Sequence, residues 1–182
     1  NQDTVISYVY TSGTTGDPKA AQITNKYFLY NSDAINMLFE FKQHEKLPAF
    51  LPTSHVGGKI FDFGVSLITA RQMYLVEDMN NLFSYILEIQ PEVFGGIPRL
   101  YEKMYEIIQN HIKSLDKNKQ RIIEEAMNIS KEYFSLKLND KEVPEELTLL
   151  FKDVDENILK KLREITFGKN IRIMTSGAAS LH

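Results

Sequence analysis

Short runs of β-branched and aromatic residues alternate along the chain with stretches in which apolar residues recur every three or four positions. Val5–Tyr10 is the first such run, and it stops at a Ser, Thr and Gly cluster, which predicts a buried strand leading into a loop. Ala20–Ile23 predicts a short return strand. We then expect Thr24 or Asn25 to cap a helix that ends at Phe39.

The same alternation continues to the end of the chain. Further short apolar runs predict strands at Ala49–Leu51, Met73–Val76, Val93–Gly96 and Ile171–Met174. The helices between them are expected to begin near Ser54, Asp78 and Pro98. Strands that alternate with helices predict an α/β fold with a mainly parallel sheet flanked by helices, whose ligands bind at the strand ends.

One long stretch, residues 116–167, is charged and helical in pattern, and it carries no strand signal. It is broken once, at Val143–Pro144, and Gly168 is the expected C-cap at its end. We interpret this stretch as a helical insertion. The basic run Lys117–Arg121 within it is typical of a solvated helix face, with contact to anionic lipid as the alternative.

Composition narrows the class of protein. With 182 residues, 43% hydrophobic and 25% charged, the chain fits one globular domain, and a net charge of −3 disfavours nucleic acid as a partner. The absence of cysteine excludes disulfide scaffolds, cysteine-ligated zinc and a thiol nucleophile, and makes a cytoplasmic location the default expectation. No run approaches the ~20 apolar residues that span a bilayer, so at most peripheral membrane contact is expected. Because the chain begins at Asn1 within patterned sequence, we expect it to be a piece of a longer polypeptide.

The segment Thr11–Lys19 is the most informative one for chemistry. Its two glycines permit a tight turn, while its hydroxyls and free amides supply hydrogen-bond donors, and Lys19 adds a positive charge beyond Pro18. This donor set suits a polyphosphate, and a solvated Ser/Thr/Gly hairpin is the alternative. The Walker pattern is absent, because the pairs Gly58-Lys59 and Gly168-Lys169 are not followed by Ser or Thr.

Tyr10–Lys19 resembles the phosphate loop of the adenylate-forming (AMP-binding) acyl-CoA synthetases. Three other segments resemble the same family in the same order. Leu51–His55 is similar to its acyl-site segment, Gly96–Lys103 to the Val-Pro-Arg-x-x-Glu-Lys segment of long-chain members, and Ser176–Ala179 to its adenine-side turn. The resemblance covers essentially the whole chain, and the helical stretch 116–167 suits the long-chain or very-long-chain (bubblegum-type) branch.

The resemblance implies part of the large N-terminal domain of a ligase that activates a fatty carboxylate with ATP and Mg²⁺ and passes the acyl group to CoA. It implies catalytic roles for Lys19 and His55, an acyl-substrate contact for His55 and Gly57, and an approach of Thr11 to Mg²⁺. The nucleotide-binding residues that it implies are Thr11, Ser12, Gly13, Thr14, Thr15, Gly16, Lys19, Gly177, Ala178 and Ala179. The alternative for His55 is a histidine that packs near the turn or caps it.

Four positions depart from the family pattern. Ala20 replaces a usual Gly, Asn25 a usual His or Gln, and Ser180 a usual Pro. Lys59 stands four residues after His55, where some long-chain members have an aromatic gate residue, which argues against such a gate here.

Two other functions stay open. The chain could belong to another adenylate-forming ligase, acting on aryl or amino acids, or to a non-catalytic homologue that binds nucleotide or acyl groups. The family's Mg²⁺-binding Glu, ribose-binding Asp and C-terminal Lys would follow residue 182, so we expect the isolated chain to be inactive.

Overall fold

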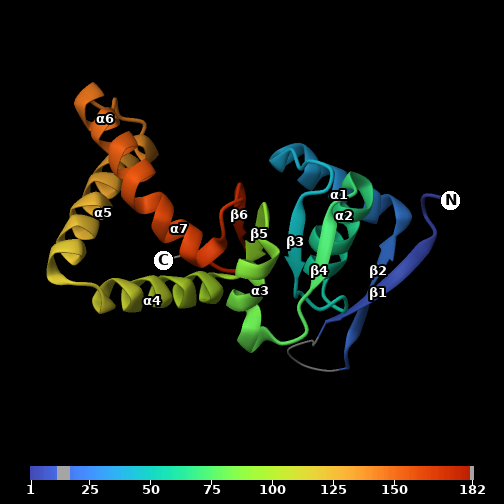
Figure 1. Cartoon of the computed structure of the whole chain (residues 1–182). Coiled ribbons are helices and arrows are strands. Elements are labelled where there is room, and N and C mark those ends of the chain that lie inside the picture. Colours follow the sequence, from blue (N-terminus) through green and yellow to red (C-terminus); the bar gives the residue numbers. More distant parts are fainter. Residues whose placement is uncertain (12–16, 181–182) are drawn as a thin grey trace. The chain divides into compact units, whose positions relative to one another are not determined.

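The computed structural model describes residues 1–11 and 17–180, and these form two compact units (Figure 1). Unit 1 comprises Asn1–Phe94 and Asn170–Met174, and unit 2 comprises Gly95–Lys169 and Thr175–His182. The elements of unit 1 are β1 (Val5–Thr11), β2 (Lys19–Thr24), α1 (Asn25–Phe39), β3 (Lys46–Ala49), η1 (Gly58–Gly64), α2 (Val65–Thr69), β4 (Gln72–Leu75), η2 (Met79–Asn81) and α3 (Leu82–Ile89). Unit 2 contains α4 (Pro98–Ser114), α5 (Lys117–Leu138), α6 (Glu145–Val154), η3 (Asp155–Leu159) and α7 (Lys160–Phe167).

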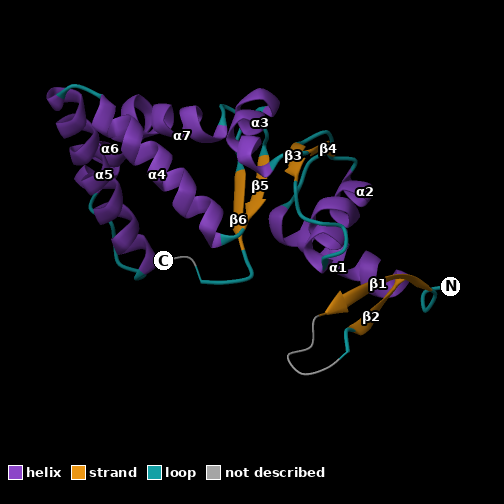
Figure 2. Ribbon diagram, turned by 90° about the horizontal axis from the view of Figure 1, so that it is seen from below, coloured by secondary structure: helices purple, strands orange, loops and turns teal. Residues whose placement is uncertain are grey.

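The strands pair two by two (Figure 2). β1 and β2 are antiparallel, β3 and β4 are parallel, and β5 (Val93–Gly96) pairs with β6 (Ile173–Ser176). Helices follow or precede each pair, which confirms the predicted α/β class with short parallel strands. The prediction that the first strand is buried is wrong: Tyr8 is 52% and Tyr10 is 70% exposed, because β1 has β2 as its one partner in the sheet.

Local sequence signals set several element ends in unit 1. The Thr24 hydroxyl accepts a hydrogen bond from the Tyr27 amide at 3.2 Å, and the Asp78 carboxylate accepts one from the Asn80 amide at 2.9 Å, so both predicted caps are confirmed. Two strands are displaced from their predicted ranges. β3 ends at Ala49, where the predicted run began, and β6 begins at Ile173.

The core of unit 1 forms two apolar clusters. One joins Val9, Ile23, Phe28 and Ile60, and so packs the β1–β2 hairpin against α1 and η1. The other joins Phe41, Leu47, Val65 and Val93. The helix η1 is a π-helix and contributes to the first cluster, which brings the segment that follows His55 against the hairpin.

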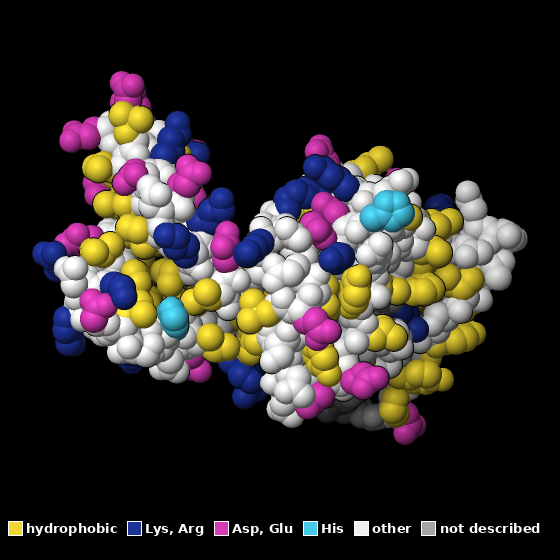
Figure 3. Space-filling view, viewed as in Figure 1, with side chains coloured by type: hydrophobic (Ala, Val, Ile, Leu, Met, Phe, Trp, Pro, Cys, Tyr) yellow, Lys and Arg dark blue, Asp and Glu magenta, His cyan; other side chains and the backbone are white. Residues whose placement is uncertain are grey.

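Unit 2 is helical where the sequence predicts helices. α5, α6 and α7 cover most of residues 116–167, and Gly168, at φ 81°, is the C-cap of α7 as predicted. Ile112, Ile123 and Leu162 form its apolar core. Basic (Lys and Arg) and acidic (Asp and Glu) side chains are interspersed over these helices in Figure 3, as a solvated face requires. Of the helices that the structure describes, none is long and apolar enough to cross a membrane.

Candidate functional site

The β1–β2 hairpin carries the predicted phosphate loop. The antiparallel register places Thr11, the last residue of β1, opposite Lys19, the first residue of β2. Ser12, Gly13, Thr14, Thr15 and Gly16 lie outside the described residues. The hairpin therefore brings together the two ends of the loop, and with them the predicted residues Thr11 and Lys19.

His55 lies in the loop that connects β3 to η1. Its backbone amide donates to the Pro52 carbonyl at 2.9 Å, and its carbonyl accepts from the Lys59 amide at 3.1 Å. The Gly57 amide donates to Nδ1 of the His55 ring at 3.0 Å. A neutral ring that accepts at Nδ1 carries its proton on Nε2, so the exposed His55 presents an N–H donor. The predicted Ser54 cap is not seen among the described residues, since backbone groups and the His55 ring close this turn instead.

A cavity of about 550 Å³ lies beside His55 in unit 1. It is lined by Tyr8, Val9, Tyr10, Pro52, Ser54, His55 and Val56. The lining residues of β1 lead directly to Thr11, so the cavity and the loop share one strand.

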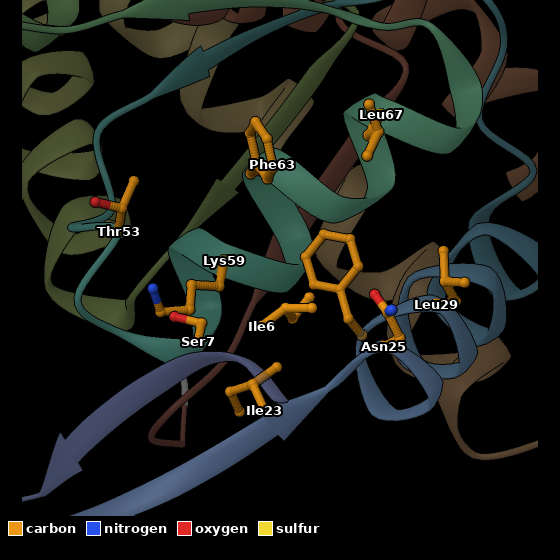
Figure 4. A pocket seen from close by; sticks show the side chains of 10 residues that line it. Ile6, Ser7, Ile23, Asn25, Leu29, Thr53, Lys59, Phe63 and Leu67 are labelled. Atoms are coloured by element: carbon orange, nitrogen blue, oxygen red, sulfur yellow. The ribbon is translucent and has the colours of Figure 1, made fainter. Parts of the chain in front are cut away.

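A second cavity, of about 490 Å³, lies further back along the same strand (Figure 4). Most of its lining is apolar, from Ile6, Ile23, Phe28, Leu29, Phe63 and Leu67, and the polar lining residues are Ser7, Asn25, Thr53 and Lys59. Figure 4 shows the Lys59 ammonium on the same side of the view as Ser7 and Thr53, away from Leu29 and Leu67. The lining thus combines a mostly apolar surface with one positive charge, that of Lys59.

The predicted adenine-side turn belongs to unit 2. The Gly177 amide donates to the Gly96 carbonyl at 3.2 Å, and Ala178 has a left-handed φ of 70°. Ala179 follows in the same exposed turn. The Tyr101 hydroxyl donates to the Thr175 carbonyl at 2.6 Å, and burial raises the pKa of Tyr101 to about 12. The turn is thus tied to β5 and α4 within its own unit.

Sequence reasoning missed three buried charged residues in unit 1, of which Glu45 is 5% exposed and pairs with Arg172. Asp62 on η1 and Arg71 before β4 are each 6% exposed. Burial raises the pKa of Asp62 to about 7, against the lowering effects of a hydrogen bond from the Leu51 amide and of the Arg71 charge. Burial also lowers the pKa of Arg71 to about 10, although Asp62 and Glu45 raise it. A carboxylate placed between Phe61 and Phe63 is the signal that could have revealed the buried Asp62.

The metal prediction rests on Thr11, whose side chain lies outside the described part of the structure. Within residues 1–11 and 17–180, no group of three or more His, Asp or Glu side chains could hold a metal ion.

The whole chain, residues 1–182, matches the family described as AMP-binding enzyme. The chain belongs to that family. It is 27% identical over 179 residues to a putative fatty-acid–CoA ligase, fadD11, of Mycobacterium tuberculosis, a match that covers 97% of this chain and 31% of the relative. It is 30% identical over 128 residues to the human long-chain-fatty-acid–CoA ligase ACSBG2, covering 68% of this chain and 19% of the relative.

A solved structure supports the fold. A malonyl-CoA ligase in a ternary product complex with methylmalonyl-CoA and AMP matches this AMP-binding chain with a TM-score of 0.55. The match has 23% identity and covers 60% of this chain and 24% of that one. Family and fold agree with the predicted resemblance. The chain spans about a third of the length of the first relative, so the activity of a whole ligase is a matter for proposal.

Proposed function

We propose that this chain supplies the pyrophosphate-binding and acyl-binding elements of a long-chain fatty acid–CoA ligase. In that reaction a fatty carboxylate oxygen attacks the α-phosphorus of ATP, the bond to the β-phosphate oxygen breaks, and pyrophosphate leaves. The CoA thiol then attacks the acyl carbon, loses its proton, and displaces AMP. The observation that carries the proposal is that β1 borders the His55 cavity and ends at the phosphate loop.

Lys19 and the loop are proposed to stabilise the charge that develops on the departing pyrophosphate. A preorganised cation and amide donors act most strongly where negative charge appears in the transition state. Thr11 is proposed to approach the Mg²⁺ that accompanies ATP. Gly177, Ala178 and Ala179 are proposed to border the adenine, since small side chains permit a close approach of the backbone.

His55 is proposed to orient the fatty carboxylate. The hydrogen bond from Gly57 to Nδ1 leaves the Nε2–H to donate to a carboxylate oxygen. Gly57 has no side chain to obstruct that approach, and a Cβ there would lie 3.1 Å from the His55 Nδ1. The exposure of the ring argues against a packed histidine, whereas the bond from the Gly57 amide to Nδ1 is the contact that a turn-capping histidine would make, so the capping alternative stays open.

The 490 Å³ cavity is proposed to receive the acyl chain, with Lys59 at its polar end. Lys59 carries the only charge among the described residues that line it, and none of the ion pairs formed by described residues involves its ammonium. A cation in an apolar cavity attracts the carboxylate of an amphiphile and disfavours a cationic ligand. This feature supports a fatty acid over an amino acid as substrate.

The first test replaces Lys19 in a ligase that contains this chain. Lys19→Ala should slow fatty-acid-dependent ATP–pyrophosphate exchange about a hundredfold, because one preorganised donor is worth about 3 kcal/mol in the transition state. Lys141→Ala is the matched control, since Lys141 is exposed in the loop after α5. If the unmodified protein shows no ATP–pyrophosphate exchange, a non-catalytic binding protein is favoured. If exchange occurs with aryl or amino acids alone, another adenylate-forming ligase is favoured.

The second test separates the substrate role of His55 from a structural one. His55→Ala should raise the fatty-acid KM or lower adenylate formation while the ATP dissociation constant stays nearly unaltered. A lower melting temperature with unchanged acyl kinetics would remove His55 from the site.

Two sequence expectations accompany the proposal. We retain residues 116–167 as a helical insertion within a partial AMP-binding domain, and a cytoplasmic location with at most peripheral membrane contact. Both rest on the sequence pattern.

A further inference from the structure

Tyr101 is a half-buried tyrosine whose hydroxyl the reaction as described does not use. It lies in the first turn of α4, three residues after Pro98 and three before Met104, and both of these are buried. Residues three apart lie on the same side of a helix, so Tyr101 belongs to the buried side of α4. Tyr105, one turn further along, is 56% exposed. A tyrosine on the buried side of a helix needs a partner for its hydroxyl, and that partner indicates what the residue does.

The partner is the backbone next to the predicted adenine-side turn. The Tyr101 hydroxyl donates to the Thr175 carbonyl at 2.6 Å, across 74 residues of sequence. Burial raises the pKa of Tyr101 to about 12, so the hydroxyl keeps its proton and remains a donor at neutral pH. Two residues after Thr175, the Gly177 amide donates to the Gly96 carbonyl at 3.2 Å. The backbone that enters the turn is therefore tied at Thr175 and at Gly177.

The turn itself contains a residue in an unfavourable conformation. Ala178 has a φ of 70°, in the left-handed region, which costs free energy for a residue that carries a Cβ. Such a conformation persists where surrounding contacts hold it, and it is enriched at ligand sites. The hydrogen bonds of Thr175 and Gly177 come immediately before Ala178 in the chain, so they are in place to hold it.

The small side chains of the turn are open to a ligand. Apart from its neighbours in the chain, no described residue has an atom within 4 Å of a Cβ placed at Gly177. Ala178 and Ala179 are exposed as well. The turn is thus tied through its backbone and unobstructed at its side chains, and a surface that is fixed before the ligand arrives binds it at a lower entropic cost.

We infer that Tyr101 is a positioning residue for the nucleotide: its hydroxyl holds the Thr175 carbonyl and thereby keeps the turn Gly177–Ala179 in the conformation that receives the adenine ring. That the turn receives adenine rests on the proposed function. That Tyr101 holds the turn does not, so the two parts are tested separately. The alternative is a tyrosine that packs α4 and merely satisfies its own hydroxyl.

The first experiment is made on this chain and needs no activity. Tyr101→Phe keeps the ring and removes the hydroxyl, so α4 should stay packed while the turn loses one tie. By NMR the Gly177 amide should exchange its proton about tenfold faster, whereas the amides of α4 should exchange as in the wild type. Tyr105→Phe is the matched control, because it removes an exposed hydroxyl from the same helix. Equal Gly177 exchange in the wild type and Tyr101→Phe would overturn the inference.

The wild type supplies a second measurement that does not depend on the folding of any variant. The Tyr101 hydroxyl proton should exchange with water slowly enough to be observed by NMR, because it is held in a short hydrogen bond. The hydroxyl proton of the exposed Tyr105 should not be observed. If neither hydroxyl proton is protected, Tyr101 does not hold Thr175 and the inference is wrong.

The third experiment uses a ligase that contains the chain. Tyr101→Phe should raise the ATP KM about tenfold with little change in the fatty-acid KM. Adding Ala178→Gly should recover about two- to fivefold of that loss, because glycine adopts a left-handed φ without strain.

A merely structural role gives a different result in the ligase. Equal changes in both KM values, no recovery by Ala178→Gly, or kinetics like those of Tyr105→Phe would show that Tyr101 does not position the nucleotide. A ligase without any fatty-acid-dependent exchange would instead refute the proposed function. The two NMR measurements would still decide whether Tyr101 holds the turn.

Discussion

The two units of this AMP-binding chain bury different kinds of side chain. Among the described residues, unit 1 buries Glu45, Asp62 and Arg71 together with several hydroxyls, whereas the one buried polar residue of unit 2 is Thr166. The Thr166 hydroxyl donates to the Leu162 carbonyl of its own helix at 3.1 Å. Unit 2 is therefore held together by apolar packing.

The ion pairs of the two units differ in the same way. Arg163 and Asp155 in unit 2 lie 2.5 Å apart at the surface, while Glu45 in unit 1 is 5% exposed and pairs with Arg172. Buried charges are costly unless they are paired and hydrogen-bonded. In unit 1 the buried charged residues Asp62 and Arg71 belong to the same unit as His55.

The largest effect on stability is expected from removing the buried guanidinium of unit 1, which belongs to Arg71. At a pH well above 7, where Asp62 is ionised, Arg71→Met should lower the free energy of unfolding of unit 1 by about 3–5 kcal/mol, because Asp62 would be left as a buried charge without its counter-charge. Amide hydrogen exchange at increasing urea concentration measures the free energy of unfolding of each unit separately. The double variant Arg71→Met/Asp62→Leu should recover part of the lost unfolding free energy. If the double variant is as unstable as Arg71→Met alone, the argument from the buried charge is wrong.

A second prediction concerns pH. The pKa of Asp62 is raised from 3.8 to about 7, so between these values the folded state holds a proton that the unfolded state has released. The free energy of unfolding should therefore fall as the pH rises from 4 to 7, by at most about 1.4 kcal/mol for each pH unit. Asp62→Asn should lose this contribution, and identical pH profiles for the two proteins would show that Asp62 is not the group.

In unit 2 the corresponding loss of stability is expected from a substitution in the apolar core. Ile123→Ala should destabilise the helices by about 2–4 kcal/mol, since Ile123 is buried against Ile112 and Leu162. Leu138→Ala is the control, because Leu138 is 83% exposed, and it should change stability by less than about 0.5 kcal/mol. Equal effects of the two substitutions on helix melting would mean that this core does not stabilise unit 2.

Close backbone packing gives a smaller effect. Gly58→Ala should destabilise unit 1 by about 1–3 kcal/mol, because its Cβ would meet the Leu51 and Pro52 carbonyls. Gly177→Ala should be near neutral, since nothing lies within 4 Å of a Cβ there. Thermal melts of the two variants test this. If both melt at the wild-type temperature, the close packing at Gly58 does not contribute to stability.

The smallest effect is expected at the surface of unit 2. Arg163→Met should cost less than about 1 kcal/mol, because an exposed ion pair gains little in water. The difference in unfolding free energy between the wild type and Arg163→Met should become smaller still at high salt. A cost as large as that of Arg71→Met would remove the contrast between the two units.

The signals that predicted this fold correctly are local ones. Thr24 and Asp78 cap helices within three residues of themselves, and Pro98 begins α4 as its fixed φ favours. Strand ranges were less accurate, because pairing decides them. Lys46–Ala49 is a strand through its parallel register with Gln72–Leu75, a segment more than twenty residues away in the sequence.

The sequence by itself determined the family, through the motif Tyr10–Lys19 and the order of the segments that follow it. It also determined the helical character of residues 116–167, since helical periodicity and caps depend on residues that are close together in the sequence. Only the tertiary structure decided that Asp62 and Arg71 are buried in one unit and that one strand borders both the His55 cavity and the loop. Burial and long-range contact set these relations, and the free energy of a buried charge depends on neighbours that no local pattern specifies.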